Sequence, residues 1–217
     1  MSDKDSRAGK RYADPAIHDY LAGVHAAHDD ALGAAFSSPE NDGLPAIMVS
    51  QTEGRMLELL LRMIAARRVV EVGTLAGYSA IRMAAALPAN GRLWTIEYDP
   101  RHAEVARKNI AAAGYDDRVE VITGDAGEVL TTLEPHGPFD AVFVDADKER
   151  YDVYGAWAAR HLRPGGVLLG DNAHFFGRLL EDSDGARAMR RFHEQAVETF
   201  HSVCIPTPDG LLLGVKK

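Results

Sequence analysis

Apolar positions recur at helical spacing near the start of the chain and later gather into short runs. Residues 16–36 carry apolar side chains about every three to four positions, which predicts one helix. Two prolines and Gly43 predict a loop over 37–45, and a second helix is expected over about 52–66. Residues 1–14 lack such a pattern, so we expect them to be irregular.

From residue 69 onward, short apolar runs alternate with helix-like segments. Strands are predicted at 69–72, 93–96, 119–123, 141–144 and 167–169, and helices at 78–87, 100–113, 151–161 and 186–200, with a short helix after 123. The end of the chain differs, because two strands, 202–205 and 211–215, flank a Pro/Asp/Gly turn. This order predicts an α/β fold with a mostly parallel sheet, helices on both faces and one antiparallel hairpin.

Length, charge and cysteine content limit the class of protein. The 217 residues suit one domain, 1–217, with a sizeable core. The net charge of −8 repels phosphates, so no nucleic-acid partner is expected. Cys204 is the only cysteine, which excludes an internal disulfide and fits a reducing compartment. Met1–Pro15 has no apolar core and Met56–Ala66 is too short to span a bilayer, so we expect a cytoplasmic protein without membrane contact.

Glycines and acids stand at the tips of the first three strands of the alternating region. Gly73 and Gly77 follow the first strand and permit a tight turn, but their spacing is not the G-x-G-x-x-G that binds a pyrophosphate. Glu97 ends the second strand, where an acid can accept hydrogen bonds from a ribose. Asp125 follows the third strand and can bind an adenine amino group or cap the next helix. Each feature alone also fits an ordinary turn, a solvated acid or a cap, but together they predict a nucleoside ligand without phosphates.

Oxygen-bearing side chains follow the next two predicted strands. Asp145 comes after 141–144, and Asp171 and Asn172 come after 167–169. If these strands are neighbours, about 4.8 Å apart, the three side chains meet. Two carboxylates and an amide oxygen suit magnesium, calcium or manganese rather than zinc. Lys148 is then a candidate proton acceptor, because desolvation and a nearby cation favour its neutral form. A turn at Asp171–Asn172, a helix cap at Asp145 and a surface ion pair at Lys148 are the alternatives.

Taken together, these motifs resemble the metal-dependent O-methyltransferases, the group of catechol and caffeoyl-CoA O-methyltransferases. The matching segments are Glu71–Ser79, Glu97, Gly124–Ala126, Phe143–Lys148 with Tyr151, Asp171–Asn172, Pro208–Gly210 and, before the core, Met48–Leu57. The resemblance covers roughly residues 16–217. It implies a Rossmann-like class I methyltransferase fold, with a seven-stranded sheet whose last strand is antiparallel. It also implies a cap formed by the helices of about residues 16–66 over a core that begins near residue 67.

The resemblance further implies the reaction and its residues. It implies methyl transfer from S-adenosylmethionine (SAM) to a hydroxyl of a small, catechol-like phenol, assisted by a divalent metal, in a homodimer. Metal ligation falls to Asp145, Asp171 and Asn172, and catalysis to Lys148 as general base together with Asp145. The implied SAM contacts are Val49, Glu71, Gly73, Thr74, Ser79, Glu97, Asp125, Ala126 and Asp145. Magnesium is the expected metal, with calcium or manganese as alternatives.

One segment departs from the family pattern. Some relatives carry Leu-Trp after the Asp-Asn pair, followed by an asparagine that touches the substrate. This chain has Ala173, His174, Phe175 and Phe176 instead, so Phe176 replaces the polar contact. We therefore expect an acceptor that is smaller or more apolar than a CoA ester.

Three other interpretations remain open. A nicotinamide-dependent dehydrogenase would share the strand order, but it needs a pyrophosphate loop that Gly73–Gly77 does not provide. A non-catalytic nucleoside-binding regulator would not need Asp145, Lys148, Asp171 and Asn172 to converge. A metal-independent methyltransferase would use Asp171–Asn172 only as a turn.

Overall fold

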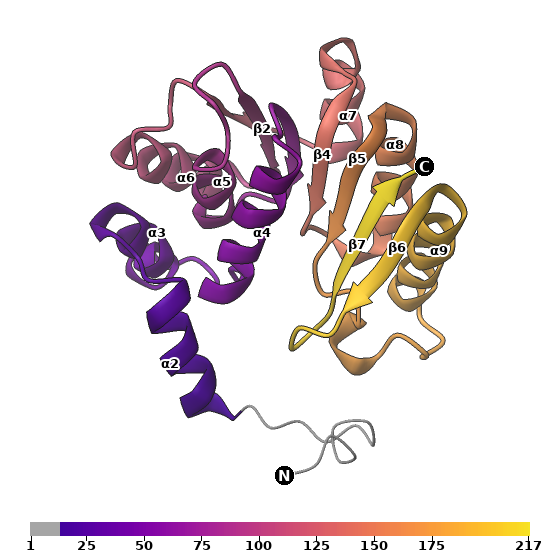
Figure 1. Ribbon diagram of the computed structural model, residues 1–217, viewed down its shortest axis with the longest axis horizontal. Helices are drawn as coiled ribbons and strands as arrows, with labels where there is room; N and C mark the ends of the chain where they lie inside the picture. Colours follow the sequence, from indigo (N-terminus) through magenta and orange to yellow (C-terminus); the bar gives the residue numbers. More distant parts are fainter. Residues whose placement is uncertain (1–13) are drawn as a thin grey trace.

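A seven-stranded sheet lies between two layers of helices in the computed structural model, which describes residues 14–217 (Figure 1). Its strands are β1 (Arg68–Val72), β2 (Arg92–Glu97), β3 (Val119–Thr123), β4 (Phe139–Val144), β5 (Leu162–Gly170), β6 (Phe200–Ile205) and β7 (Leu211–Lys216), in the order β3-β2-β1-β4-β5-β7-β6. β7 is antiparallel to both of its neighbours, and the other pairs are parallel. The predicted sheet is confirmed. Two predictions concern the first residues of the chain: an irregular start over 1–14, and no apolar core in Met1–Pro15. These residues lie largely outside the described range 14–217.

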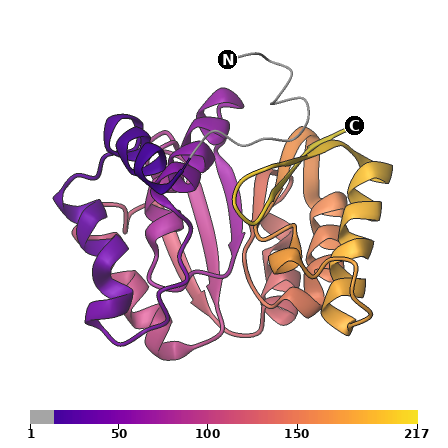
Figure 2. The same ribbon diagram turned by 90° about the horizontal axis from the view of Figure 1, so that it is seen from below.

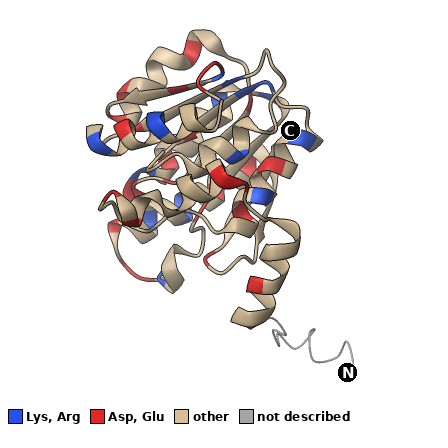
Figure 3. Ribbon diagram, turned by 90° about the vertical axis from the view of Figure 1, so that its left-hand side faces the viewer, with Lys and Arg blue, Asp and Glu red and all other residues tan. Residues whose placement is uncertain are grey.

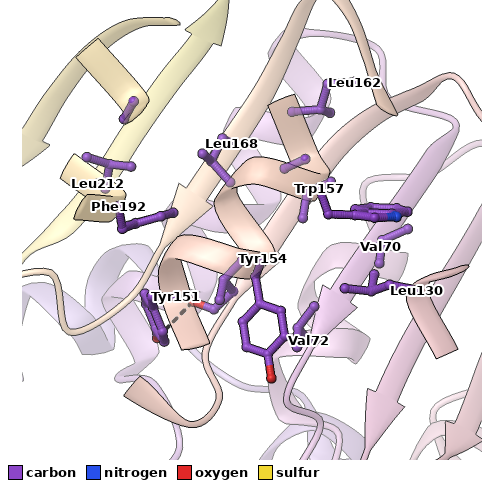
Figure 4. Close-up of a cluster of buried hydrophobic side chains, with 14 of the residues drawn as sticks. Val70, Val72, Leu130, Tyr151, Tyr154, Trp157, Leu162, Leu168, Phe192 and Leu212 are labelled. Atoms are coloured by element: carbon purple, nitrogen blue, oxygen red, sulfur yellow. Dashed lines mark hydrogen bonds between the residues drawn. The ribbon is translucent and has the colours of Figure 1, made fainter. Parts of the chain in front are cut away.

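Side chains of the central strands alternate between two apolar cores. Val70, Val142 and Leu168 belong to one core, which α7 (Ala126–Leu133), α8 (Tyr151–His161) and α9 (Asp184–Thr199) cover. Figure 4 shows part of this core around Trp157 and Phe192. Val69 and Phe143 belong to the other, beneath α3 (Asp30–Asn41), α4 (Gln51–Met63), α5 (Tyr78–Ala84) and α6 (Pro100–Ala112). The two helical layers stand on opposite sides of the sheet in Figure 2. Because both faces are covered, the central strands are mostly apolar instead of alternating, and their inner polar residues, Glu71 and Thr95, are buried as well.

The first helices differ from the sequence prediction. The single helix expected over 16–36 is wrong, because the chain forms α2 (Pro15–His25) and then α3. Asp29 starts α3 by accepting a hydrogen bond from the Leu32 amide at 2.8 Å. The loop expected over 37–45 is wrong in its first half, since α3 continues through Pro39 to Asn41. The Ala35 carbonyl, which a proline cannot bond, accepts the Ser38 hydroxyl at 3.0 Å instead.

The remaining helices and strands are present where they were predicted, except that β5 begins five residues earlier, at Leu162, and α5 ends at Ala84 instead of residue 87. The order of the strands determines which edge of the sheet can bind a ligand. The winding of the sheet reverses between β1 and β4, which are adjacent in space. Ligands of open α/β sheets bind at such a reversal, beyond the carboxyl ends of the strands. β4 and β5 are neighbours with Val144 opposite Gly170, so Asp145 and Asp171 leave the sheet at the same level.

The surface gives two further facts. Across residues 14–217, no helix combines the length and apolar character needed to cross a membrane. Acidic and basic segments are interspersed on the side of the molecule drawn in Figure 3.

Candidate active site

A cavity of about 880 Å³ lies at the carboxyl ends of the central strands. This size is typical of small-molecule sites. The predicted site residues that line it are Val49, Gly73, Thr74, Ser79, Glu97, Asp125, Ala126, Asp145, Lys148 and Asn172. Glu71 and Asp171 are buried and do not line it. The structure therefore brings the two sets of residues, nucleoside side and metal side, to one cavity.

The turn after β1 requires glycine at its first position. Gly73 has a φ of +97°, and a Cβ added there would lie 1.9 Å from the Asp145 carbonyl oxygen. The tight turn predicted here is present, and the backbone that approaches Gly73 is that of Asp145, directly after the neighbouring strand β4. Leu75 also has a positive φ, 50°, which is uncommon without glycine and marks a constrained loop.

Two glutamates lie next to this loop, and one of them, Glu97, holds it directly. Glu97 accepts hydrogen bonds from the amides of Thr74 at 3.1 Å and Leu75 at 2.8 Å. Glu71 is fully buried and accepts the hydroxyls of Ser79 at 2.5 Å and Thr95 at 2.6 Å. Burial raises the pKa of Glu71 to about 8, although the two hydroxyl donors oppose this shift. Glu71 therefore reaches the cavity through Ser79, whereas Glu97 faces it directly.

Asp125 combines two interactions at the start of α7. Its side chain accepts the Gly127 amide at 2.8 Å, which is the helix cap considered from the sequence. It also pairs with Arg150, whose Nη1 lies 2.7 Å from Oδ2. The Arg150 guanidinium lowers the pKa of Asp125 to about 2, so this carboxylate remains charged. Arg150 was not predicted as a site residue, because no sequence pattern links it to Asp125, which lies 25 positions earlier in the chain.

Lys148 lies at the tip of β4 between two oxygen atoms. Its Nζ donates to Asp145 Oδ1 at 2.9 Å and to the Tyr151 hydroxyl at 2.7 Å. Tyr151 in turn donates to the Val144 carbonyl at 3.2 Å, the bond drawn in Figure 4. Burial, and then the carboxylates of Asp145 and Asp171, hold the pKa of Tyr151 well above its usual value. Tyr151 thus keeps its proton and fixes the position of the Lys148 amine.

Asp171 and Asn172 follow β5 in an acidic environment. Asp171 is 5 % exposed, and its Oδ1 has no hydrogen-bond partner among residues 14–217. Burial, and then the charges of Asp145, Asp209 and Glu53, raise the pKa of Asp171 to about 8. The Asn172 amide donates to a carboxylate oxygen of Asp209. Such a buried, unpaired carboxylate fits a hard cation, which would satisfy it.

Two acids of this region were not assigned to the site from the sequence. One oxygen each of Glu53, Asp171 and Asp209 lies within 4.8 Å of the other two. Glu53 ends a Ser50-x-x-Glu53 capping box, which already explains a glutamate at that position. Asp209 belongs to the turn before β7, where aspartate is common. Local patterns therefore concealed their convergence with Asp171.

Comparisons with known proteins show the family to which this chain belongs. A model of the family described as O-methyltransferase matches residues 34–217. The chain belongs to this O-methyltransferase family. It is 42 % identical over 213 residues to a catechol O-methyltransferase of Niastella koreensis, which covers 93 % of this chain and 96 % of that relative.

Solved structures support the same assignment. The O-methyltransferase from Bacillus cereus in complex with SAH superposes with a TM-score of 0.89 at 36 % identity, covering 93 % of this chain and 97 % of that one. TomG from Streptomyces achromogenes, an O-methyltransferase in complex with SAM, gives 0.87 at 36 % identity, with 93 % and 96 % covered. The predicted fold, the family resemblance and the class of SAM-dependent O-methyltransferases are confirmed.

Proposed function

We propose that this O-methyltransferase transfers the methyl group of SAM to a hydroxyl of a catechol-like small molecule with the help of a divalent cation. A similar chain is named as a catechol O-methyltransferase. The observation that carries the proposal is the position of Lys148. Its amine is held beside Asp145 at the edge of the cavity that also contains Gly73, Glu97 and Asp125. A proton acceptor and a nucleoside-type site thus share one enclosed space.

The nucleoside half of the cavity suits SAM. Glu97 faces the cavity and suits a ribose diol, and the segment Asp125–Ala126 suits an adenine edge. We assign the remaining SAM contacts to Val49, Glu71, Gly73, Thr74, Ser79 and Asp145, of which Glu71 acts through Ser79. No phosphate has to be accommodated, which agrees with the absence of a pyrophosphate loop in Gly73–Gly77.

The metal half has a donor set that fits a hard cation. Asp145, Asp171 and Asn172 would hold it, and the unpartnered Asp171 Oδ1 supports this assignment. Magnesium is preferred, with calcium or manganese as alternatives. When bound, the cation supplies Lewis acidity and a template for two adjacent hydroxyl oxygens. Asp145 and Asn172 line the cavity, which supports a metal site within reach of the acceptor.

Lys148 serves as the general base. In its neutral form, Nζ accepts the proton of the acceptor hydroxyl. The oxygen then forms a bond to the methyl carbon of the sulfonium, the carbon–sulfur bond breaks, and the sulfur leaves as the neutral thioether of S-adenosylhomocysteine. Tyr151 and Asp145 keep the amine at a defined position, 2.7 and 2.9 Å from their oxygens. Holding the reacting groups in near-attack geometry supplies part of the rate.

Apolar side chains at the mouth of the cavity suit an aromatic acceptor. Phe176 is 61 % exposed and lines the cavity, as do Ile47 and Met48. Phe176 offers no hydrogen bond, so it favours a compact phenol over a CoA ester.

The remaining sequence predictions concern the whole molecule. We propose that the chain acts as one cytoplasmic domain capped by its first helices, and that it forms a homodimer. Ile17, Leu21 and Val24 support the dimer, because they form an exposed apolar stripe on α2, which buries none of its residues.

An acceptor screen tests the proposed reaction. Catechols, flavonoids and hydroxycinnamates are incubated with SAM and magnesium, and the methylated position is read by NMR. We expect methylation of one of two neighbouring hydroxyls. Binding of SAM without turnover on any diol would instead favour the nucleoside-binding regulator.

A further inference from the structure

Three carboxylates from distant parts of the chain meet at the edge of the cavity, where Asp209 lines it and Glu53 and Asp171 do not. Glu53 comes from the first turn of α4, Asp171 from the tip of β5 and Asp209 from the turn before β7. One oxygen of each lies within 4.8 Å of the other two. Only Asp171 belongs to the proposed set of metal ligands, so the presence of the other two needs a separate explanation.

Glu53 has more acceptor capacity than its helix uses. Its Oε2 accepts the Ser50 amide at 3.1 Å and the Ser50 hydroxyl at 2.7 Å, which completes the capping box. Its Oε1 is buried and has no partner among the described residues, as is also true of Asp171 Oδ1. The side chain is 8 % exposed overall, so water offers little compensation.

No lysine, arginine or histidine of residues 14–217 forms an ion pair with Glu53, Asp171 or Asp209. Lys148, at the tip of β4, donates instead to Asp145 and Tyr151. Two buried carboxylates with unpaired oxygens repel each other unless a cation or a proton joins them. The three carboxylates therefore lack a compensating positive charge among residues 14–217, because none of them forms an ion pair there.

Asp209 fixes the orientation of Asn172. An ionised carboxylate only accepts hydrogen bonds, so the amide nitrogen of Asn172 must face Asp209. The amide oxygen is then turned away from Asp209 and is available as a ligand. The backbones are joined as well, since His174 N donates to the Asp209 carbonyl at 2.8 Å and Ala173 N to the Gly210 carbonyl at 2.8 Å.

We propose that Glu53 and Asp209 complete the divalent-cation site, Glu53 as a carboxylate supplied by α4 and Asp209 as the residue that positions Asn172. The inference rests on the proposed metal-dependent function. It adds that a bound cation ties α4 and the β6–β7 turn to the tip of β5. Residues that orient metal ligands typically contribute about 10- to 100-fold to metal affinity.

Binding of manganese(II) alone, measured by calorimetry and by electron paramagnetic resonance, tests this proposal without turnover. We expect Glu53→Gln and Asp209→Ala each to weaken binding by about tenfold or more. Asp209→Asn should lose less than Asp209→Ala, because its amide oxygen still accepts from Asn172. The matched control is Glu58→Gln, on the same helix and 4 % exposed, whose carboxylate already pairs with Arg82 at 3.5 Å and should not affect the metal.

Hydrogen exchange provides the structural readout. Manganese should increase protection of the amides in the first turn of α4 and in residues 206–210 of the wild type, and Glu53→Gln should lose this increase in α4. Because each variant is compared with and without metal, a variant of lower stability still gives an answer. Wild-type affinity in both Glu53→Gln and Asp209→Ala, with binding lost in Asp171→Ala, would overturn the inference and leave the proposed function intact. A wild type that does not bind manganese would overturn both.

Discussion

The two halves of the cavity treat their acidic side chains differently. On the nucleoside side, Glu97 accepts backbone amides of the glycine loop, and Asp125 is bonded to Arg150 and to the start of α7. On the metal side, Asp171 and Glu53 each keep a buried oxygen without a partner in the part of the chain described by the structure. Both halves hold acids at strand tips or helix starts. Only on the nucleoside side does the protein itself supply hydrogen-bond partners for these acids.

This difference predicts that SAM binding and methyl transfer to the acceptor depend on the cation to different degrees. The satisfied half is formed before any ligand arrives, so we expect SAM to bind without metal. The unsatisfied half needs a positive charge from outside, so we expect the acceptor reaction to depend on the cation.

Asp171→Ala should have the largest effect on turnover. It removes a buried ligand of the proposed cation, whose Lewis acidity contributes several kcal/mol, so we expect a loss of about a hundredfold or more. The affinity for SAM, measured by calorimetry, should change little, since Asp171 does not line the cavity. Equal losses in SAM affinity and in rate would show that the two halves are not separable.

Lys148→Ala should lower the rate constant by about a hundredfold, the usual contribution of a general base. Lys148→Arg is the informative control, because it keeps a charge beside Asp145 but does not release its proton. Both variants should lose the rise in rate with pH that reports the base. If Lys148→Ala retained the wild-type rate and pH profile, the assignment of the base would be wrong.

Asp125→Asn should act on SAM and not on the metal. Hydrogen bonds to charged groups contribute about 1.5–3 kcal/mol, so we expect the Kd for SAM to rise by about 10- to 100-fold. Asp117→Asn is a matched control, since Asp117 also pairs with an arginine, Arg118, at 3.0 Å but lies outside the cavity. A change in manganese affinity in Asp125→Asn, or an equal rise in the Kd for SAM in Asp117→Asn, would contradict the division between nucleoside side and metal side.

Glu71→Gln should change stability more than turnover. The pKa of Glu71 is raised by burial to about 8 in the folded state, so folding favours its protonated form. The contribution of the protonated Glu71 carboxyl to the free energy of unfolding is fully present below its unfolded pKa, near 4.5. This contribution is lost as the pH rises through about 8. Relative to the variant, the wild type should therefore lose about 1 kcal/mol or more between pH 5 and pH 9 in urea unfolding. Parallel stability curves for the two proteins would show that Glu71 is ionised in the fold.

The sequence predicted the sheet well because its signals are local and repeated. Apolar runs such as 141–144 and the glycine turn after β1 each determine their own segment, and the register of β4 and β5 then brings Asp145 and Asp171 to one edge. The break between α2 and α3 was missed because Asp29 begins a helix inside a pattern that still looks periodic.

Long-range pairing was beyond sequence reasoning. Glu53, Asp209 and Arg150 reach the site through the packing of α4, the β6–β7 turn and the segment before α8. A helix cap, a turn residue and a surface arginine are each ordinary at these positions. The family pattern did include the segments Met48–Leu57 and Pro208–Gly210, but it gave no role to Glu53 or Asp209. Only the fold shows that Glu53 Oε1 has no hydrogen-bond partner among the described residues, and that Asp209 accepts a hydrogen bond from the Asn172 amide.

Methyl transfer from labelled SAM to catechol, measured with chelator-treated protein before and after addition of magnesium, tests the central claim most directly. The unpaired acids at the tip of β5 predict no turnover in chelator, full recovery with magnesium, and SAM binding that is unchanged throughout. A rate in chelator equal to that with magnesium would contradict the claim and leave a metal-independent methyltransferase.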